Sequence, residues 1–400
     1  MKIALETKNA LDHGFAAAFG RQPRRYFSAP GRTEIGGNHT DHQLGRVLAA
    51  AVELEILAAV DRNDGNRIRI QSQGYSLCEV DLQDLQPRAG EENTTAALVR
   101  GVAAAFAARG CKVRGFDAYV TSTVLPGSGL SSSAALEVLL GTVCNSLFFD
   151  NALPPQEIAK IGQWAENFYF GKPCGLMDQM ASAVGGLIAM DFADPAAPEV
   201  RPVDFDFDTC GHRLCIIDTH ASHADLTEEY AAVPGEMKAV AACFGQEALS
   251  RVDPAAFYKE MAALRQTCGD RAVLRAIHYF EENSRVSRQV SALEKGDFHE
   301  FLELVKESGR SSFMYLQNVT VSGSVAHQEM ALTLALCEKL LQGRGACRVH
   351  GGGFAGTVQA FVPCDLVESF RRGVEEVLGQ GSCLWMNIRP YGGVELEVQP

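Results

Sequence analysis

Three segments of this sequence hold residues whose types and spacing could bind or transfer a phosphate group. The first, LPGSGLSSSAALEV (125–138), lies between a predicted strand and a predicted helix. Its glycines let the backbone approach a ligand, and the helix N-terminus offers unpaired N–H groups and a positive dipole end. These features predict an anion site, although the Lys-Ser/Thr pair of a Walker A loop is absent. The alternative is a plain strand-to-helix turn capped by Ser131.

The second and third segments are weaker signals when each is taken alone. APGRTEIGGNHTDHQLGRVLAAAV (29–52) places arginines, histidines and Asp41 in one bend between apolar runs. A bend this polar either is solvated or holds a ligand. VHGGGFAGTVQAFV (349–362) is another glycine cluster followed by a strand, and a tight turn beside a packed surface explains it equally well.

Asp178 is a candidate acid or base because of its neighbours. It lies in AENFYFGKPCGLMDQMAS (165–182), where methionines flank it on both sides. Such a carboxylate is expected to be at least partly buried, and buried carboxylates are rare unless paired or functional. Glu166, in the same segment, could supply a second acid. A helix N-cap or an internal salt bridge are the alternatives for Asp178.

The elements that must position these residues mix strands and helices without a strict βαβ alternation. This mixture predicts an α+β fold rather than a doubly wound sheet. The length of 400 residues favours two domains, with a boundary in the proline-rich segment 194–204. Helices are expected at 5–20, 95–110, 130–149, 154–170, most of 254–342 and 368–379, and strands at 47–62, 67–82, 116–126, 185–192, 212–220, 358–363 and 396–400.

Composition limits the partners of the chain. The formal net charge of -13 argues against a nucleic-acid or anionic-membrane partner. The N-terminus does not read as a signal peptide, and no run of about 18 apolar residues predicts a membrane span. The 12 cysteines include no C-x-x-C pair, so we expect reduced thiols in a cytoplasmic protein rather than a zinc site or a disulfide framework.

Taken in order, the motifs form a specific pattern. They resemble the motifs of the GHMP small-molecule kinases, and within these the galactokinases. The four segments are GRTEIGGNHTDHQLG (31–45), PGSGLSSSAALE (126–137), CGLMDQ (174–179) and GGGFAG (351–356). The resemblance extends from about residue 29 to the end of the sequence. It implies a two-domain GHMP kinase architecture with the active site in the interdomain cleft. Residues 1–200 would carry the sugar-binding and phosphate loops, and residues 201–400 the GGGFAG loop.

The resemblance also implies an activity and a set of roles. The chain would be an ATP-dependent kinase that converts D-galactose into α-D-galactose 1-phosphate. Asp178 matches the catalytic base, and Arg32 would favour its ionised form and stabilise phosphoryl charge. Ser132 and Glu166 match the ligands of Mg²⁺, which prefers oxygen and keeps waters. ATP would contact Gly127, Ser128, Gly129, Leu130, Ser131, Ser132 and Ser133, and the sugar would contact Asn38, His39, Asp41, Gly175 and Tyr230.

Asn38 is the main departure from the family motif, which carries a glutamate near the C6 hydroxyl of the sugar. Asparagine is neutral and can donate as well as accept, and His42 replaces the usual tyrosine. These changes leave open a related substrate, such as galacturonate or N-acetylgalactosamine. A second departure is the segment SSFMYLQNVTVS (311–322), because galactokinases typically carry an acidic segment at this place. A sugar and ATP sensor without turnover is a further alternative, against which the intact SSSAA segment, Arg32 and Asp178 argue.

Overall fold

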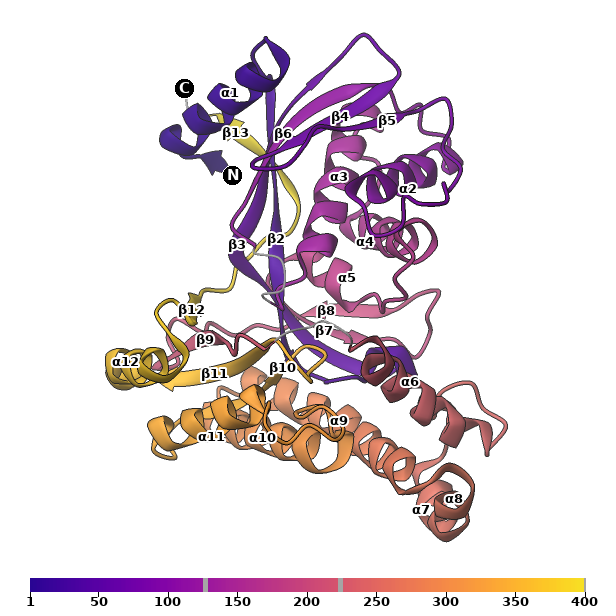
Figure 1. Cartoon of the computed structure of the whole chain (residues 1–400), viewed down its shortest axis with the longest axis vertical. Helices are drawn as coiled ribbons and strands as arrows, with labels where there is room; N and C mark the ends of the chain where they lie inside the picture. Colours follow the sequence, from indigo (N-terminus) through magenta and orange to yellow (C-terminus); the bar gives the residue numbers. More distant parts are fainter. Residues whose placement is uncertain (125–128, 222–225, 399–400) are drawn as a thin grey trace.

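The computed structural model describes residues 1–124, 129–221 and 226–398, and within these ranges the chain forms two sheets covered by helices (Figure 1). The larger sheet has nine strands in the order β1-β13-β2-β3-β6-β4-β5, with β7 beside β3 and β8 beside β7. The smaller sheet has the order β10-β11-β9-β12 and is antiparallel throughout. This arrangement confirms the predicted α+β fold.

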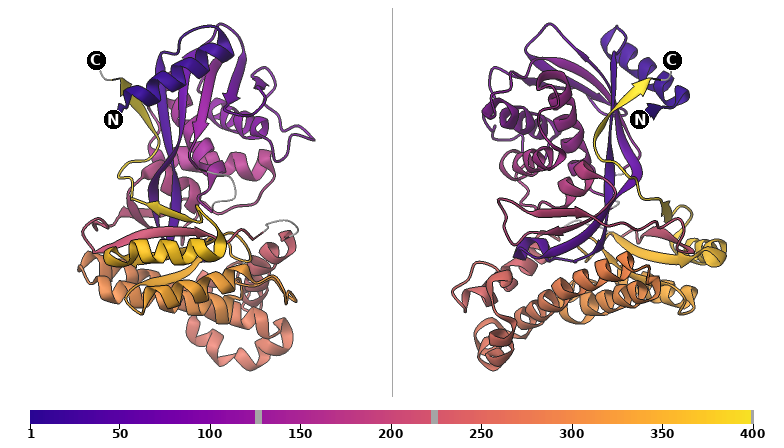
Figure 2. Two further views of the ribbon diagram at one scale, coloured as in Figure 1. Left: turned by 60° about the vertical axis from the view of Figure 1, so that its left-hand side comes forward. Right: turned by 180° about the vertical axis from the view of Figure 1, so that it is seen from behind.

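The first sheet is built around two long strands, β2 (Arg25–Gly36) and β3 (Arg46–Arg62), whose apolar residues are mostly buried. Helices α2 to α5 lie on one side of these strands and α1 on the other (Figures 1 and 2). The remaining elements are β1 (Lys2–Ile3), β4 (Arg67–Ser72), β5 (Cys78–Asp81), β6 (Phe116–Ser122), β7 (Leu187–Asp191), β8 (Glu199–Pro202), β13 (Val394–Val398), α1 (Leu5–Phe19), α2 (Thr95–Ala108), α3 (Ser132–Phe148), α4 (Pro155–Ala165) and α5 (Met177–Val184).

The second sheet is packed against helices that come largely from the segment predicted to be helical. Figure 1 shows α9, α10 and α11 below this sheet, with α6, α7 and α8 beyond one end. No described helix is long and apolar enough to cross a bilayer. The elements are β9 (His212–Asp218), β10 (Ala346–His350), β11 (Thr357–Pro363), β12 (Cys383–Met386), α6 (Thr227–Ala242), α7 (Pro254–Lys259), α8 (Met261–Cys268), α9 (Asp270–Glu294), α10 (Phe298–Ser311), α11 (Glu329–Leu341) and α12 (Val367–Leu378).

The structure corrects the extent of the polar bend at 29–52. Strand β2 continues to Gly36, and β3 begins at Arg46, so only the residues between them turn. The pairing of β2 with β3 shifts register between Pro30 and Arg32 and again between Glu34 and Gly36. Such bulges interrupt the side-chain alternation by which a strand is recognised in a sequence.

Strand β13 belongs to the first sheet although it follows the whole second sheet in the sequence. It pairs antiparallel with β2, where Val394 is opposite Ser28, and parallel with the short β1. The chain therefore passes between the two sheets twice. The domain boundary near residue 200 stays a prediction, and residues 394–398 lie with the first sheet.

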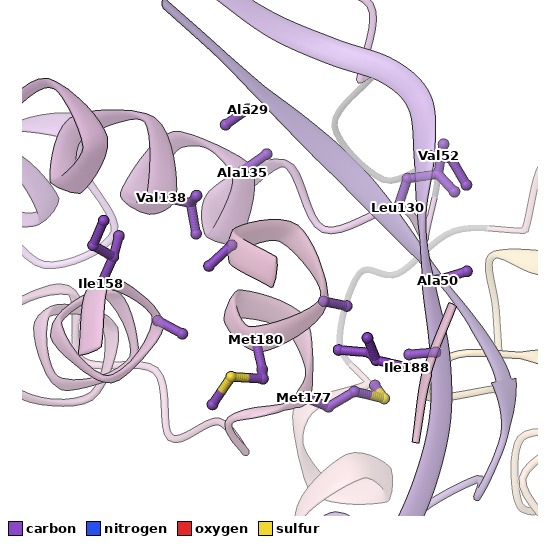
Figure 3. Close-up of a cluster of buried hydrophobic side chains, with 14 of the residues drawn as sticks. Ala29, Ala50, Val52, Leu130, Ala135, Val138, Ile158, Met177, Met180 and Ile188 are labelled. Carbon is purple, nitrogen blue, oxygen red and sulfur yellow. The ribbon is translucent and has the colours of Figure 1, made fainter. Parts of the chain in front are cut away.

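Small apolar side chains bring α3 and α5 close to the long strands. Figure 3 shows Ala29 and Ala50 on the strand side, Ala135 on α3, and Met177 and Met180 on α5. Met180 is fully buried, and burying a side chain of this size stabilises the fold by about 1.5 to 3 kcal/mol. This packing fixes the start of α5 beside β2, which is where the candidate site forms.

Candidate functional site

Arg32 on β2 and Asp178 in the first turn of α5 form a bidentate ion pair. Arg32 Nε donates to Asp178 Oδ1 at 2.7 Å, and Nη2 donates to Oδ2 at 2.8 Å. The third guanidinium nitrogen, Nη1, donates to the carbonyl oxygen of Gly129 at 2.5 Å. The pair joins residues 146 positions apart and connects them to the predicted phosphate loop.

Ser131 is a second partner of Asp178. It stands at the N-cap position of α3 with a positive φ of 59°, and its side chain makes no capping hydrogen bond. Its hydroxyl donates to Asp178 Oδ2 instead. Burial opposes ionisation of Asp178, but the charge and hydrogen bonds of Arg32 and the bond from Ser131 outweigh it and hold the pKa of Asp178 below its ordinary value. Asp178 is therefore a carboxylate, able to accept a proton or a hydrogen bond.

A pocket of about 500 Å³ brings together four of the five predicted sugar-binding residues. His39, Asp41, Gly175 and Tyr230 all line it. They come from the turn between β2 and β3, the segment before α5, and α6. The volume lies within the range usual for small-molecule sites.

Gly175 and Asp41 are in close contact across this pocket. A methyl group at Gly175 would lie 1.8 Å from Asp41 Oδ2, so only glycine fits there. Burial, reinforced by the charges of Asp178 and Glu34, raises the pKa of Asp41 to about 6. Leu176, two residues before Asp178, also lines the pocket, so the pocket lies next to the Arg32–Asp178 pair.

The glycine loop 351–356 meets the pocket through two of its lining residues. His39 Nε2 is 2.9 Å from the carbonyl oxygen of Gly352, and the hydroxyl of Tyr230 donates to the carbonyl oxygen of Gly353 at 2.9 Å. His39 Nδ1 is 3.1 Å from His42 Nε2. Burial lowers the pKa of both histidines, that of His42 by much more, so His42 is neutral at neutral pH. The GGGFAG motif thus contacts two of the residues that line the pocket.

Asn38, the fifth predicted sugar-binding residue, is placed elsewhere. It is fully buried and is absent from the described lining of the pocket. Its Nδ2 donates to Gly351 O at 2.6 Å and to Glu34 Oε1 at 3.1 Å, and its Oδ1 accepts from Asn318 Nδ2 at 2.9 Å. The amide of Asn38 is therefore occupied by protein partners.

The phosphate loop is described in part. Gly127 and Ser128 lie outside the described residues. Gly129 has a φ of 72°, and a methyl group on it would lie 2.6 Å from Thr357 Oγ1 of the second sheet. The buried Leu130 accepts a hydrogen bond from Arg32 N at 3.1 Å. The predicted phosphate loop and the second sheet are thus in close contact at Gly129.

Two carboxylates near the start of α3, Glu137 and Glu166, form an acidic corner that is the candidate metal-binding site. Glu166 is 2% exposed, and its carboxylate accepts from Ser133 Oγ at 2.9 Å, from Gln179 Nε2 at 2.8 Å and from Lys172 Nζ at 3.3 Å. Gln179 Nε2 also donates to Glu137 Oε2 at 2.9 Å. Burial and the charge of Glu166 raise the pKa of Glu137 well above its usual range.

This corner fits a cation that prefers oxygen ligands. Glu137 Oε1 and Gln179 Oε1 are buried acceptors without a hydrogen-bond partner among the described residues. Ser132, predicted as a metal ligand, is the first residue of α3, and the described hydrogen bond to Glu166 comes from its neighbour Ser133. Sequence reasoning did not single out Glu137, Lys172 or Gln179. The position of Glu137 within the SSSAALE motif and of Gln179 beside Asp178 were the available signals.

Comparison with known proteins shows which family the chain is similar to. Residues 97–186 match the family model described as the GHMP kinases N terminal domain, and residues 13–62 match the galactokinase galactose-binding signature. The chain is 32% identical to a galactokinase of Streptomyces coelicolor and 33% identical to one of Actinobacillus pleuropneumoniae, each match covering 90% of both chains.

A solved structure shows the same likeness in three dimensions. The crystal structure of Lactococcus lactis galactokinase complexed with galactose has a TM-score of 0.82 and 26% identity, covering 97% of this chain and 99% of that one. Kinases of this kind use ATP with a divalent metal ion. With identity above 30% over nine-tenths of its length to curated galactokinases, the chain belongs to the galactokinase family of the GHMP kinases.

Proposed function

We propose that this chain is a cytoplasmic, ATP-dependent kinase that phosphorylates the C1 hydroxyl of D-galactose, giving α-D-galactose 1-phosphate and ADP. The observation that carries the proposal is the ionised Asp178, held by Arg32, beside a pocket lined by Asp41, Gly175 and Tyr230. The names of the relatives supply the sugar, and the 12 free cysteines suit a reducing compartment.

The residues of the site divide the work between the sugar and the phosphate. Asp41 has two carboxylate oxygens that can accept hydrogen bonds from two neighbouring sugar hydroxyls, which favours one epimer over another. Asp178 accepts the hydrogen of the C1 hydroxyl and takes up its proton as the new O–P bond forms. Arg32 keeps Asp178 ionised and lies close enough to the phosphate loop, through Gly129 O, to stabilise phosphoryl charge.

We assign the divalent metal as Mg²⁺ and its protein ligands to the acidic corner. Glu166 would hold it together with a hydroxyl at the start of α3, either the expected Ser132 or Ser133, which already bonds to Glu166. When bound with ATP, Mg²⁺ neutralises phosphate charge and so favours transfer. Lys172, 3.3 Å from Glu166, offsets the carboxylate charge of this corner.

Galacturonate is a second candidate substrate, and Lys238 is the observation that favours it. Asn38 and His42 motivated the idea, but Asn38 is occupied by protein partners and His42 is neutral. Lys238, on α6, lines the pocket, and none of the ion pairs found among the described residues includes it. An ammonium group there could pair with a C6 carboxylate.

The test is ADP release with Mg-ATP across galactose, glucose, N-acetylgalactosamine and galacturonate at matched concentrations. We expect a clear preference for galactose. A preference for galacturonate that Lys238→Met abolishes would instead support the second candidate. ATP binding without ADP release on any sugar would support the sensor interpretation and overturn the kinase proposal.

A further inference from the structure

Two cysteines far from the kinase site lie side by side at the surface. Cys243 Sγ and Cys268 Sγ are 3.5 Å apart, although 25 positions separate them in the sequence. Cys243 is exposed and Cys268 is partly exposed, and both are free thiols. The part of the chain that the structure describes places no further histidine, cysteine or carboxylate with them in a cluster of three or more that could hold a metal ion.

The packing of two helices holds these thiols together. Cys243 directly follows α6, and Cys268 is the last residue of α8. Met237 and Val240 of α6 are buried in the same apolar cluster as Leu264 of α8. Because the helices are held by this cluster, the short distance between the sulfurs is a property of the folded chain.

We infer that Cys243 and Cys268 form a redox modification site, at which a hydroperoxide converts the two thiols into an intramolecular disulfide. The exposed Cys243 thiol loses its proton and its sulfur attacks the peroxide. The O–O bond breaks, and the leaving hydroxide takes up that proton, so that a sulfenic acid and water are formed. The sulfur of Cys268 then attacks the sulfenic sulfur, and the second oxygen leaves as water. Two thiols and one hydrogen peroxide thus give one disulfide and two waters.

The surroundings allow both closure and reopening of this bond. Closing it requires the sulfurs to approach from 3.5 Å to about 2.05 Å. A turn follows Cys243, and Cys268 is followed by Gly269, where an added methyl group would meet no atom within 4 Å, so both backbones have room to adjust. The exposure of Cys243 gives a reducing thiol access to the bond.

The bond would join the end of α6 to α8. Helix α6 also carries Tyr230 and Lys238, which line the pocket. A cross-link that fits the native geometry restricts the unfolded chain and therefore stabilises the fold. Oxidation would in this way stiffen the element that forms one wall of the sugar pocket.

Peptide mapping of the full chain tests the inference directly. The protein is treated with a small excess of hydrogen peroxide, the remaining thiols are alkylated, and the protein is digested with trypsin without reduction. Cys243 then lies in fragment 239–251 and Cys268 in fragment 266–271, and each fragment contains a single cysteine. We expect these two fragments to appear joined, to separate on reduction, and to remain separate in Cys243→Ser and Cys268→Ser.

Thermal unfolding provides the second measurement. The peroxide-treated protein should unfold about 2 to 6 °C higher than the reduced protein, and Cys268→Ser should show no such rise. Cys364→Ser, which removes another exposed thiol, is the matched control and should behave like the unaltered chain. Recovery of sulfinic acid on Cys243 without the joined fragments would overturn the inference. An unchanged or lower unfolding temperature with the fragments joined would overturn the stabilising effect assigned to the bond.

Discussion

The side-chain amides of Asn38 and Asn318 are joined by a 2.9 Å hydrogen bond in which Asn318 Nδ2 donates to Asn38 Oδ1. These residues lie in the two segments where this chain departs most from the usual galactokinase motifs. Asn318 also accepts a backbone hydrogen bond from Phe354, and Asn38 donates to Gly351, both in the glycine loop. The two residues that differ from the usual motifs therefore contact each other in the interior, and both form hydrogen bonds to the glycine loop.

Replacing Asn38 by aspartate should destabilise the fold. The substitution exchanges the Nδ2 donor for an acceptor that would face Glu34 and the carbonyl oxygen of Gly351. We expect a loss of about 2 to 4 kcal/mol in the free energy of unfolding, measured by urea titration. Asn66→Asp, at an exposed position, is the matched control. If the Asn38→Asp protein is as stable as this control, the hydrogen bonds of the Asn38 amide do not stabilise the fold.

Replacing Asp178 by asparagine should abolish turnover while ATP still binds. The amide cannot take up a proton from the sugar, and it no longer neutralises Arg32. We expect kcat to fall by about 10² to 10⁴-fold, with the dissociation constant for Mg-ATP changing little. Asp64→Asn, at an exposed position, should leave both quantities unchanged. A near-normal kcat in Asp178→Asn would mean that Asp178 does not act on the sugar hydroxyl.

The KM for galactose should depend on pH through Asp41. Its pKa is raised to about 6, so it gains a proton as the pH falls through this value and loses acceptor capacity for sugar hydroxyls. The KM should therefore rise several-fold between about pH 7.5 and about pH 5. Asp178 does not titrate in this window because its pKa is lowered. In Asp41→Asn we expect a higher KM that no longer rises toward acid pH; a rise of the original size there would assign the titration to another group.

The raised pKa of Asp41 also makes the stability of the fold depend on pH. A carboxyl group whose folded pKa lies above its unfolded value stabilises the fold most below the unfolded pKa, and this contribution is lost as the pH rises through the folded pKa. Asp41 therefore opposes folding at neutral pH, where it is ionised, and Asp41→Asn should be at least as stable as the original chain at about pH 7.5.

Replacing Gly175 by alanine should weaken sugar binding. The added methyl group would lie 1.8 Å from Asp41 Oδ2, so the carboxylate must move out of its place in the pocket. We expect the KM for galactose to rise by about 10-fold or more, while the KM for ATP stays close to its original value. Gly235→Ala, where the added methyl group meets nothing within 4 Å, is the control. Equal KM values in the two variants would exclude a role for the Gly175–Asp41 contact.

The sequence was most informative where a motif fixes both residue type and local geometry. Arg32, Asp178 and Ser131 were identified from their motifs, and the structure brings them into contact. Helix α3 and strand β3 were expected close to their observed bounds because their apolar patterns are regular. The continuation of β2 through Gly31 was missed because its bulges and glycines disrupt the alternation of side chains.

Partners that are distant in the sequence could not be predicted. Asn38 was expected to contact the sugar because the family motif carries a sugar-contacting glutamate at its position. Its neighbours His39 and Asp41 do line the pocket, but its own side chain turns inward to Asn318. A motif does not specify which face a buried polar residue adopts when its hydrogen-bond partners lie hundreds of positions away. The same limit applies to Gln179, whose two carboxylate partners come from different helices.

The position of β13 sets an order for folding during synthesis. Because β13 lies between β1 and β2, the first sheet cannot reach its final strand order until the ribosome has translated every residue of the second sheet. The half of the chain that emerges first must wait with the Tyr26 edge of β2 open, while the half that emerges later can complete its own four strands. Completion of the first sheet therefore depends on synthesis of the second half of the chain, and until then the first half exposes an unpaired strand edge of the kind that promotes wrong association.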